Sequence, residues 1–296
     1  MEWLKLLQDS VNYMEEHILE NINYEDVAKK VGMSSYNFHR TFSLMAGMTA
    51  NAYIRSRRLS LAGQELQMTD MSVIDAAYKY GYETPESFSK AFSRFHSVTP
   101  KHAKTKGTQI RMFNPLIIKI ILEGGNIMDY RIEKKDKQRF IAKVKAFSNE
   151  IINDEEDLSI SEFWAECHEE KSVEAIRNLR PDGKKDLYGL CSPAKKDSST
   201  FDYGIGVLLD HETNIGSLDT LLREGFSLWE TKPVEYAVLK CFGTDGDCIS
   251  QMWSRFFKEF LANTKYGHTD DTDYELYFEN GEEGLFCELW IPVIER

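Results

Sequence analysis

The amino-acid sequence predicts a multidomain protein, with an all-α N-terminal domain of two helix-turn-helix units followed by a pseudo-symmetric α+β domain. Three observations support this prediction. The first hundred residues repeat a helical pattern, the remainder repeats a pattern of strands around a helix, and the charge changes sign between the two parts. The length of 296 residues fits two or three domains. We expect a helical domain over 1–107, a linker with a first strand over 108–126, and the α+β domain over 127–296.

Charge is distributed unevenly along the chain. The net charge is −12, yet residues 28–107 hold 12 Lys and Arg against 5 Asp and Glu. Residues 108–296 hold 23 basic residues against 36 acidic ones. A basic segment joined to an acidic one indicates two domains with different partners.

The helical repeat pairs "AKKVGMSSYNFHRTFSLMAGMT" (28–49) with "AYKYGYETPESFSKAFSRFHSVT" (77–99). In each copy a glycine, Gly32 or Gly81, stands where a first helix must end. Ser34 or Ser35 can cap the next helix in the first copy, and Thr84 can do so in the second. Two phenylalanines one turn apart then face the core. The residues left to face outward are Tyr36, Asn37, His39, Arg40, Ser43, Glu86, Ser87, Lys90 and Arg94.

A long helix is predicted between the two copies, over "TANAYIRSRRLSLAGQELQM" (49–68). About 18 residues at 1.5 Å each give a spacer of roughly 27 Å. Adjacent major grooves lie about 34 Å apart along one face of DNA. The second helices of the two units are therefore spaced so that both could enter DNA grooves.

These residues resemble the DNA-binding domain of the AraC/XylS family of transcription regulators. The resemblance covers about residues 8–106, through "EDVAKKVGMSSYNFHRTF", "AYIRSRRLSLAGQEL" and "MSVIDAAYKYGYETPESFSKAFSRFHSVTP". It implies a transcription regulator, most often an activator, with double-stranded DNA and RNA polymerase as partners. Ser97 stands where the family usually has glycine, and "PKHAK" replaces the usual aromatic-Arg ending. The family's base-contacting positions fall on Tyr36, His39, Arg40, Pro85, Glu86 and Lys90.

The residue types at these positions suit base recognition, although each could also be ordinary solvated surface. Arginine is the commonest reader of guanine O6 and N7, which favours Arg40 as a base contact. Glu86 can accept a hydrogen bond from cytosine N4 but otherwise repels phosphate. We expect Arg57 and Arg58 to pair with acids or touch phosphate rather than read bases.

The second half begins with a linker at 105–115, a strand at "LIIKIIL" (116–122) and a turn at "EGGN" (123–126). Three blocks then recur: 139–148 with 235–243, 159–170 with 249–260, and 187–210 with 274–293. Each copy reads as strand, helix, strand, strand. Two such copies predict one pseudo-symmetric α+β domain.

This half resembles the GyrI-like effector-binding domain, over about residues 127–296. The residues that carry the resemblance are "GGNIMDYRIEKK", "AVLKCFG" and "CELWIPV". The family binds ligands between its two copies, and an acidic residue on the last strand commonly faces them. A small-molecule effector is therefore the implied partner.

Strand alternation in "LFCELWIP" places Phe286, Glu288 and Trp290 on one face. The matching face of the first copy carries Gly204 and Gly206, which would leave room beside the sheet. A carboxylate between aromatic rings favours an amphipathic organic cation as the effector. Glu288 could instead face solvent at a sheet edge. Trp164 and Trp253 are further candidates, although tryptophans on amphipathic helices more often belong to the core.

Other classes of function find little support. Five cysteines without a CxxC pair fit a reduced cytoplasmic protein, and neither a metal nor a cofactor is expected. We find neither a membrane span nor a catalytic motif, so we expect no enzyme. A GyrI-like hydrolase with Glu288 as base, or a protein that only sequesters its ligand, remains the alternative.

Overall fold

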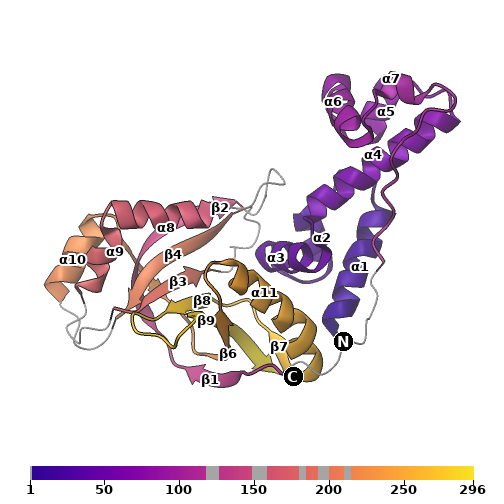
Figure 1. Ribbon diagram of the computed structural model, residues 1–296. Coiled ribbons are helices and arrows are strands. Elements are labelled where there is room, and N and C mark those ends of the chain that lie inside the picture. Colours follow the sequence, from indigo (N-terminus) through magenta and orange to yellow (C-terminus); the bar gives the residue numbers. More distant parts are fainter. Residues whose placement is uncertain (1, 118–126, 149–158, 180–184, 193–199, 210–214) are drawn as a thin grey trace. The chain divides into compact units, whose positions relative to one another are not determined.

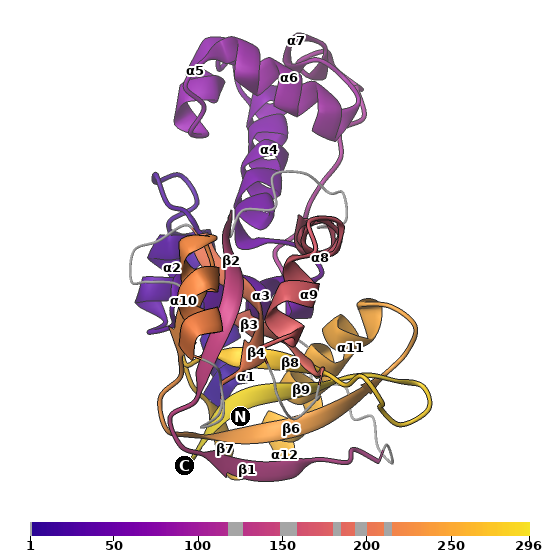
Figure 2. The same cartoon turned by 90° about the vertical axis from the view of Figure 1, so that its left-hand side faces the viewer.

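The computed structural model describes residues 2–117, 127–148, 159–179, 185–192, 200–209 and 215–296 (Figures 1 and 2). The chain divides into two compact units. One holds Met1–Met33 and Phe38–Leu122, and the other holds Glu123–Arg296 together with Ser34–Asn37. The first is helical and the second is α+β, which confirms the predicted fold class.

The helical unit contains both predicted helix-turn-helix units, formed by α2 with α3 and by α5 with α6. The long predicted helix between them is α4. The helices are α1 (Glu2–Glu16), α2 (Tyr24–Lys30), α3 (Ser35–Ala46), α4 (Ala50–Met68), α5 (Val73–Lys79), α6 (Pro85–His96) and α7 (Pro100–Ala103).

Turns and caps follow the local sequence. Gly32 and Gly81 have φ of +73° and +81°, the left-handed conformation that ends a helix without a Cβ penalty. Ser34 Oγ accepts the backbone N–H of residue 37, and Thr84 Oγ1 accepts that of residue 87. The Phe pairs of α3 and α6 are buried, as the periodicity predicts.

The turn after α6 departs from this pattern at Ser97. This residue has φ +62° and ψ +14°, although it carries a Cβ. Its backbone N–H still donates to Ser93 O, 2.9 Å away. The left-handed cap is therefore kept without the glycine that would adopt it freely.

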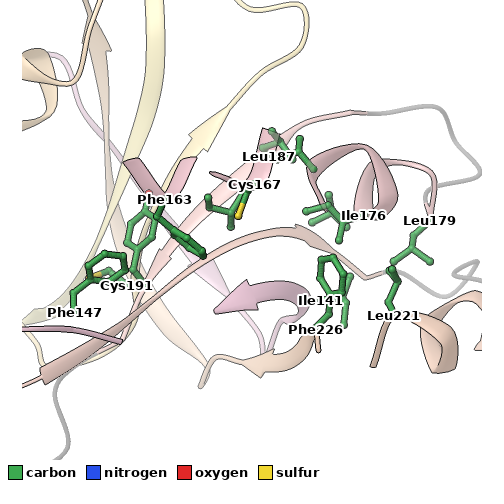
Figure 3. Close-up of a cluster of buried hydrophobic side chains, with 14 of the residues drawn as sticks. Ile141, Phe147, Phe163, Cys167, Ile176, Leu179, Leu187, Cys191, Leu221 and Phe226 are labelled. Atoms are coloured by element: carbon green, nitrogen blue, oxygen red, sulfur yellow. The ribbon is translucent and has the colours of Figure 1, made fainter. Parts of the chain in front are cut away.

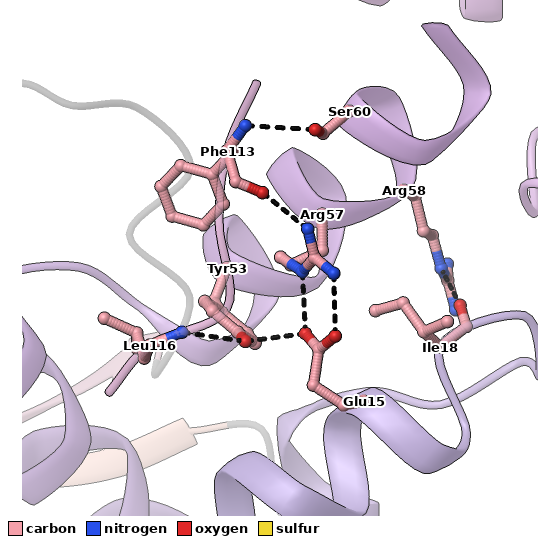
Figure 4. A network of polar contacts seen from close by, with 8 residues as sticks. All are labelled: Glu15, Ile18, Tyr53, Arg57, Arg58, Ser60, Phe113 and Leu116. Carbon is pink, nitrogen blue, oxygen red and sulfur yellow. Dashed lines mark hydrogen bonds and ion pairs between the residues drawn. The ribbon is translucent and has the colours of Figure 1, made fainter. Parts of the chain in front are cut away.

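An ion pair fastens α4 to α1. The Arg57 guanidinium donates from Nε and Nη2 to the two carboxylate oxygens of Glu15, each over 2.8 Å (Figure 4). Tyr53 donates its hydroxyl to the same carboxylate over 2.6 Å. The prediction that Arg57 pairs with an acid is confirmed.

Residues 108–117, which include most of the expected linker and the start of the expected strand, run along α4. Phe113 N–H donates to Ser60 Oγ over 3.0 Å, and Leu116 N–H donates to Tyr53 Oη over 3.3 Å (Figure 4). Ile110 packs against the core around α4 and α6. The predicted strand at 116–122 and turn at 123–126 fall almost wholly outside the described residues. Leu116 and Ile117, which are described, lie outside any strand.

The α+β unit is built around one sheet. Its strands are β1 (Arg131–Lys135), β2 (Arg139–Ser148), β3 (Leu187–Cys191), β4 (Thr200–Leu208), β5 (Ser227–Glu230), β6 (Val234–Phe242), β7 (Tyr266–His268), β8 (Asp273–Tyr277) and β9 (Leu285–Glu295). Its helices are α8 (Ser159–Glu169), α9 (Ser172–Arg177), α10 (Ile215–Arg223), α11 (Asp247–Arg255), the π-helical turn η1 (Phe256–Phe260) and α12 (Leu261–Asn263).

The strand order reflects the internal repeat. The described strands pair antiparallel in the order β1-β6-β9-β8-β3-β4-β2-β5, and β7 pairs with β9. From the centre of the sheet outward, the strands of the first copy are β3, β4 and β2. Those of the second copy, read outward in the other direction, are β8, β9 and β6, so corresponding strands take corresponding places. The copies meet where β3 pairs with β8. The predicted duplication of strand, helix, strand, strand is confirmed.

The two faces of this sheet carry different cores. Helices α8 and α9 pack on β2 and β4, and α11 packs on β6 and β9. Figure 3 shows the core beneath α8 and α9, which contains Ile141, Phe163, Cys167 and Leu187. Strand alternation places a second core on the opposite face: Phe140, Ala142, Tyr188, Leu190, Tyr236, Val238, Tyr274, Leu276 and Trp290.

Candidate functional site

The first predicted recognition helix is α3. Tyr36 lies in its first turn, and Arg40 lies one turn further along the same side. The His39 ring meets the Tyr24 ring of α2 edge to face, with centroids 5.3 Å apart. His39 therefore helps to hold the two helices of this unit together.

The second predicted recognition helix is α6. Pro85 occupies its first position, and Glu86 and Lys90 are exposed one turn apart. Arg94, also exposed, extends this line by another turn. Phe88 and Phe92 anchor the opposite side in the core. The exposed side thus carries one acid and two bases, a mixed surface that suits base edges as well as phosphates.

Glu288 lies on the sheet face opposite the helices. Both its carboxylate oxygens accept hydrogen bonds from Arg131, each over 2.7 Å, and its side chain is only 7% exposed. Arg131 and Lys135 also lie over the Trp290 ring, at 5.4 and 4.8 Å from its centroid. The structure thus brings Glu288 and Trp290 together, with cations of the chain itself beside them.

Phe286 does not join this pair. The β6–β9 register aligns Cys241 with Cys287 but Phe242 with Leu285, so Phe286 is an extra residue in a β-bulge. Its ring contacts that of Tyr277, with centroids 5.7 Å apart. The prediction that Phe286 shares a strand face with Glu288 and Trp290 assumed regular alternation of side chains, which the bulge interrupts.

The glycine positions are tightly packed rather than open. A Cβ on Gly204 would lie 3.2 Å from the Trp229 ring, and one on Gly206 would lie 2.6 Å from Ile141 O. Both glycines therefore permit close approach of neighbouring groups. The expected room beside the sheet is filled by Trp229 and by the backbone of β2.

The two helical tryptophans have different surroundings. Trp253 is 1% exposed and stacks on Phe257, so it belongs to the core under α11. Trp164 on α8 is half-buried and donates its indole N–H to Tyr203 Oη over 3.1 Å. Its ring also contacts the Tyr277 ring, with centroids 5.1 Å apart.

Trp164 leads to a buried carboxylate, Glu275 of β8. Tyr203 of β4 donates its hydroxyl to Glu275 Oε2 over 3.0 Å, and Glu275 is 7% exposed. Gly189 of β3 makes this contact possible, because a Cβ there would lie 2.2 Å from Tyr203 Oη and 2.3 Å from Glu275 Oε2. The group of Trp164, Tyr203, Glu275, Tyr277 and Phe286, here called the Glu275 cluster, draws on both copies of the repeat.

The electrostatics of the Glu275 cluster favour neutral tyrosines. Burial raises the pKa of Tyr203 well above its ordinary value, and the neighbouring Glu275 carboxylate raises it further. The same two causes raise the pKa of Tyr277. Tyr203 therefore remains a hydrogen-bond donor to Glu275 across the physiological range of pH.

Sequence reasoning missed Glu275 because it concentrated on the last strand. One signal was present in "DYELY" (273–277), where a carboxylate alternates with tyrosines inside a short apolar strand. The repeat also predicts that Arg94 faces outward, although the family's base-contacting positions do not include it.

Among the residues that the structure describes, no group of three or more His, Cys, Asp or Glu side chains is arranged to hold a metal ion. All five cysteines are free thiols. Among the described helices, none combines the length and apolar composition that a membrane crossing needs.

Comparison with known proteins gives matches for both parts of the chain. A helix-turn-helix domain family matches residues 27–106, and the integron-associated effector binding protein family matches residues 131–293. The chain is 38% identical over 100 residues to the regulatory protein SoxS of Escherichia coli (strain K12), a match covering 34% of this chain and 94% of SoxS.

Other relatives share one part of the chain. The uncharacterized HTH-type transcriptional regulator YbfP of Bacillus subtilis (strain 168) is 35% identical over 105 residues, a match that spans only 36% of each protein. The structure of SAV2435 bound to tetraphenylphosphonium is similar over 56% of this chain and 94% of that one, with 16% identity and a TM-score of 0.46.

The effector-binding family covers more than half of the chain, and the helix-turn-helix match covers nearly all of SoxS. The chain therefore belongs to the integron-associated effector binding proteins, with a GyrI-like domain that follows an AraC-type DNA-binding domain, and it is a DNA-binding transcription regulator of the AraC family.

Proposed function

We propose that this regulator is an activator, and that an amphipathic organic cation bound beside Glu275 controls its affinity for DNA. The observation that carries the proposal is the buried Glu275 carboxylate, set among aromatic side chains in the effector-binding domain. Activation, with RNA polymerase as partner, is the direction typical of AraC/XylS-type regulators.

The chemistry of the cluster supports a cation as ligand. An ionised carboxylate in apolar surroundings is poorly solvated, and an approaching positive charge stabilises it. Aromatic faces attract cations by about 0.5–2 kcal/mol each. Trp164, Tyr277 and Phe286 supply such rings, and Tyr203 orients the carboxylate through its hydrogen bond.

Glu288 is the competing carboxylate for this role. Its two oxygens accept hydrogen bonds from Arg131, so a ligand cation there would have to displace a bidentate pair. Glu275 belongs to a cluster with the rings of Trp164, Tyr277 and Phe286, which can add cation–π attraction. We therefore assign the cation to Glu275 and the Arg131–Glu288 pair to structural support of β1 and β9.

The test is calorimetric binding of benzyltrimethylammonium and its uncharged carbon isostere neopentylbenzene to the whole chain. Glu275→Gln should weaken the cation at least tenfold while leaving the neutral compound within twofold, because the shape is kept and the charge is lost. Glu288→Gln is the matched control and should not change the preference for the cation. Equal weakening of both compounds by Glu275→Gln would refute the charge-pairing role.

Regulation itself is tested on DNA. An operator is first selected from a randomised duplex library with the ligand-free protein. The cation should then change operator affinity, and transcription with purified RNA polymerase should rise with the regulator present. An operator affinity that is the same with saturating cation would leave a ligand-sequestering protein instead, and a fall in transcription would make the protein a repressor.

A further inference from the structure

Arg58 lies in the middle of α4, the helix that separates the two helix-turn-helix units. Its guanidinium donates from Nε to Ile18 O over 2.7 Å and from Nη2 to Glu20 O over 2.5 Å (Figure 4 shows the first contact). Both carbonyls belong to the turn that follows α1 and leads into α2. Arg58 thus fixes the turn that leads into the first helix-turn-helix unit.

The same guanidinium also touches the second unit. A Cβ built on Gly81 would lie 2.8 Å from Nη1 of Arg58, so the glycine turn between α5 and α6 is in close contact with this side chain. Gly81 has φ +81°, and its lack of a side chain leaves the space that Nη1 occupies. One planar group therefore contacts both DNA-binding units.

Other polar contacts of α4 reach one unit each. Asn51 Oδ1 accepts the backbone N–H of Tyr24 over 3.0 Å in the first unit. Glu65 accepts from Lys79 and Tyr80, over 2.6 and 2.8 Å, in the second. Arg58 differs from both because its three nitrogens are divided between the two units.

We propose that Arg58 is a positioning residue that sets the angle between the two helix-turn-helix units, and so determines which spacing of operator half-sites one chain accepts. The α4 helix has 19 residues and is about 28 Å long. A tilt of roughly 10° over that length moves its far end by about 5 Å, more than the ~3.4 Å between base pairs. Small changes at the Arg58 contact are thus large enough to change the spacing that fits.

The inference depends on the DNA-binding domain alone and is independent of the effector. Its experiment uses the whole chain and duplexes in which the two selected half-sites are separated by spacers of stepped length. Arg58→Met keeps the aliphatic stem but removes every donor. The control is Arg55→Met, which removes the same charge from an exposed position on the same helix.

Wild type and Arg55→Met should bind one spacer length at least tenfold better than its neighbours. Arg58→Met should lose most of that preference, or shift it by a base pair, while affinity for an isolated half-site stays within about twofold of Arg55→Met. An equal loss of affinity at every spacer length, with the preference intact, would overturn the proposal.

A second variant keeps the test valid if Arg58→Met unfolds. Arg58→Lys retains the charge, but its single ammonium replaces a planar fork that reaches in three directions. It should fold, as circular dichroism can confirm, and should still broaden the spacing preference. A folded Arg58→Lys protein with the wild-type preference would also refute the assignment.

Discussion

Arg57 and Glu15 form a bidentate ion pair that joins the middle of α4 to the end of α1, with both N–O distances at 2.8 Å. The Arg57 side chain is 8% exposed and that of Glu15 is 25% exposed, so the pair is shielded from much of the solvent. Tyr53 and the carbonyl of Phe113 complete the network around it (Figure 4). Stability of the helical domain should therefore depend on the charge of Glu15.

The first prediction concerns acid. Burial raises the pKa of Glu15, but hydrogen bonds from Arg57 and Tyr53 outweigh it and leave the pKa below its usual value. A depressed folded pKa means that the pair stabilises the fold above the unfolded value of about 4.3 and is lost as pH falls through the folded value. Glu15→Gln should cost about 1–3 kcal/mol at pH 7, and this cost should decrease as the pH falls below about 4.3, the unfolded pKa.

The measurement is chemical unfolding of both proteins at several pH values, followed by circular dichroism. Glu16→Gln, on the neighbouring position of α1, is the control for a general change of charge. A difference between wild type and Glu15→Gln that stays constant from pH 7 to pH 3 would contradict the prediction.

The second prediction concerns the end of the DNA-binding domain. A fragment ending at residue 117 should be more stable than one ending at 107 by about 2 kcal/mol, since it keeps the bonds to Ser60 and Tyr53 and the partly buried Ile110. Thermal unfolding of the two fragments measures the difference. If the two fragments unfold at the same temperature, residues 108–117 add no stability to the helical domain and the prediction is wrong.

The sequence predicted what depends on local pattern and on repetition. Glycine turns, the Phe38 and Phe42 pair, and the duplicated strands all follow from periodicity, which acts over neighbouring residues. Arg131 lies 157 positions from Glu288, and periodicity carries no information about such a partner. The bulge at Phe286 arises from a register shift between β6 and β9, which neither strand shows alone.

The third prediction concerns the left-handed Ser97. Replacing it by glycine removes the steric penalty of a Cβ at φ +62°, of about 1–2 kcal/mol, and adds the entropy cost of glycine in the unfolded chain. Ser97→Gly should therefore stabilise the protein by roughly 0.5–1 kcal/mol. Ser93→Gly, inside α6, should instead destabilise it by about the same amount. Thermal unfolding that ranks the two variants the other way would contradict this account.

The fourth prediction separates base readers from phosphate contacts. Arg40→Ala should cost about 1–3 kcal/mol of operator affinity and relax preference at one base pair, as expected for a bidentate guanine contact. Lys90→Ala, on the exposed side of α6, should lower affinity for all sequences alike if Lys90 contacts phosphate, with a reduced salt dependence. Binding to a randomised operator library distinguishes the two patterns, and an unchanged sequence preference for Arg40→Ala would remove Arg40 from the reading set.

The fifth prediction concerns Gly189 and the Glu275 cluster. Alanine at this position would place a methyl group 2.2 Å from Tyr203 Oη and 2.3 Å from Glu275 Oε2, so the hydrogen bond between them could not keep its geometry. Gly189→Ala should destabilise the α+β domain by about 1–3 kcal/mol and abolish the preference for cationic ligands. Tyr203→Phe removes the hydroxyl that the methyl group would strike. In that background the added cost of Gly189→Ala should fall by at least half, a coupling that a double-mutant cycle measures directly. Additive costs of the two substitutions would show that Gly189 matters for another reason, such as its backbone conformation in β3.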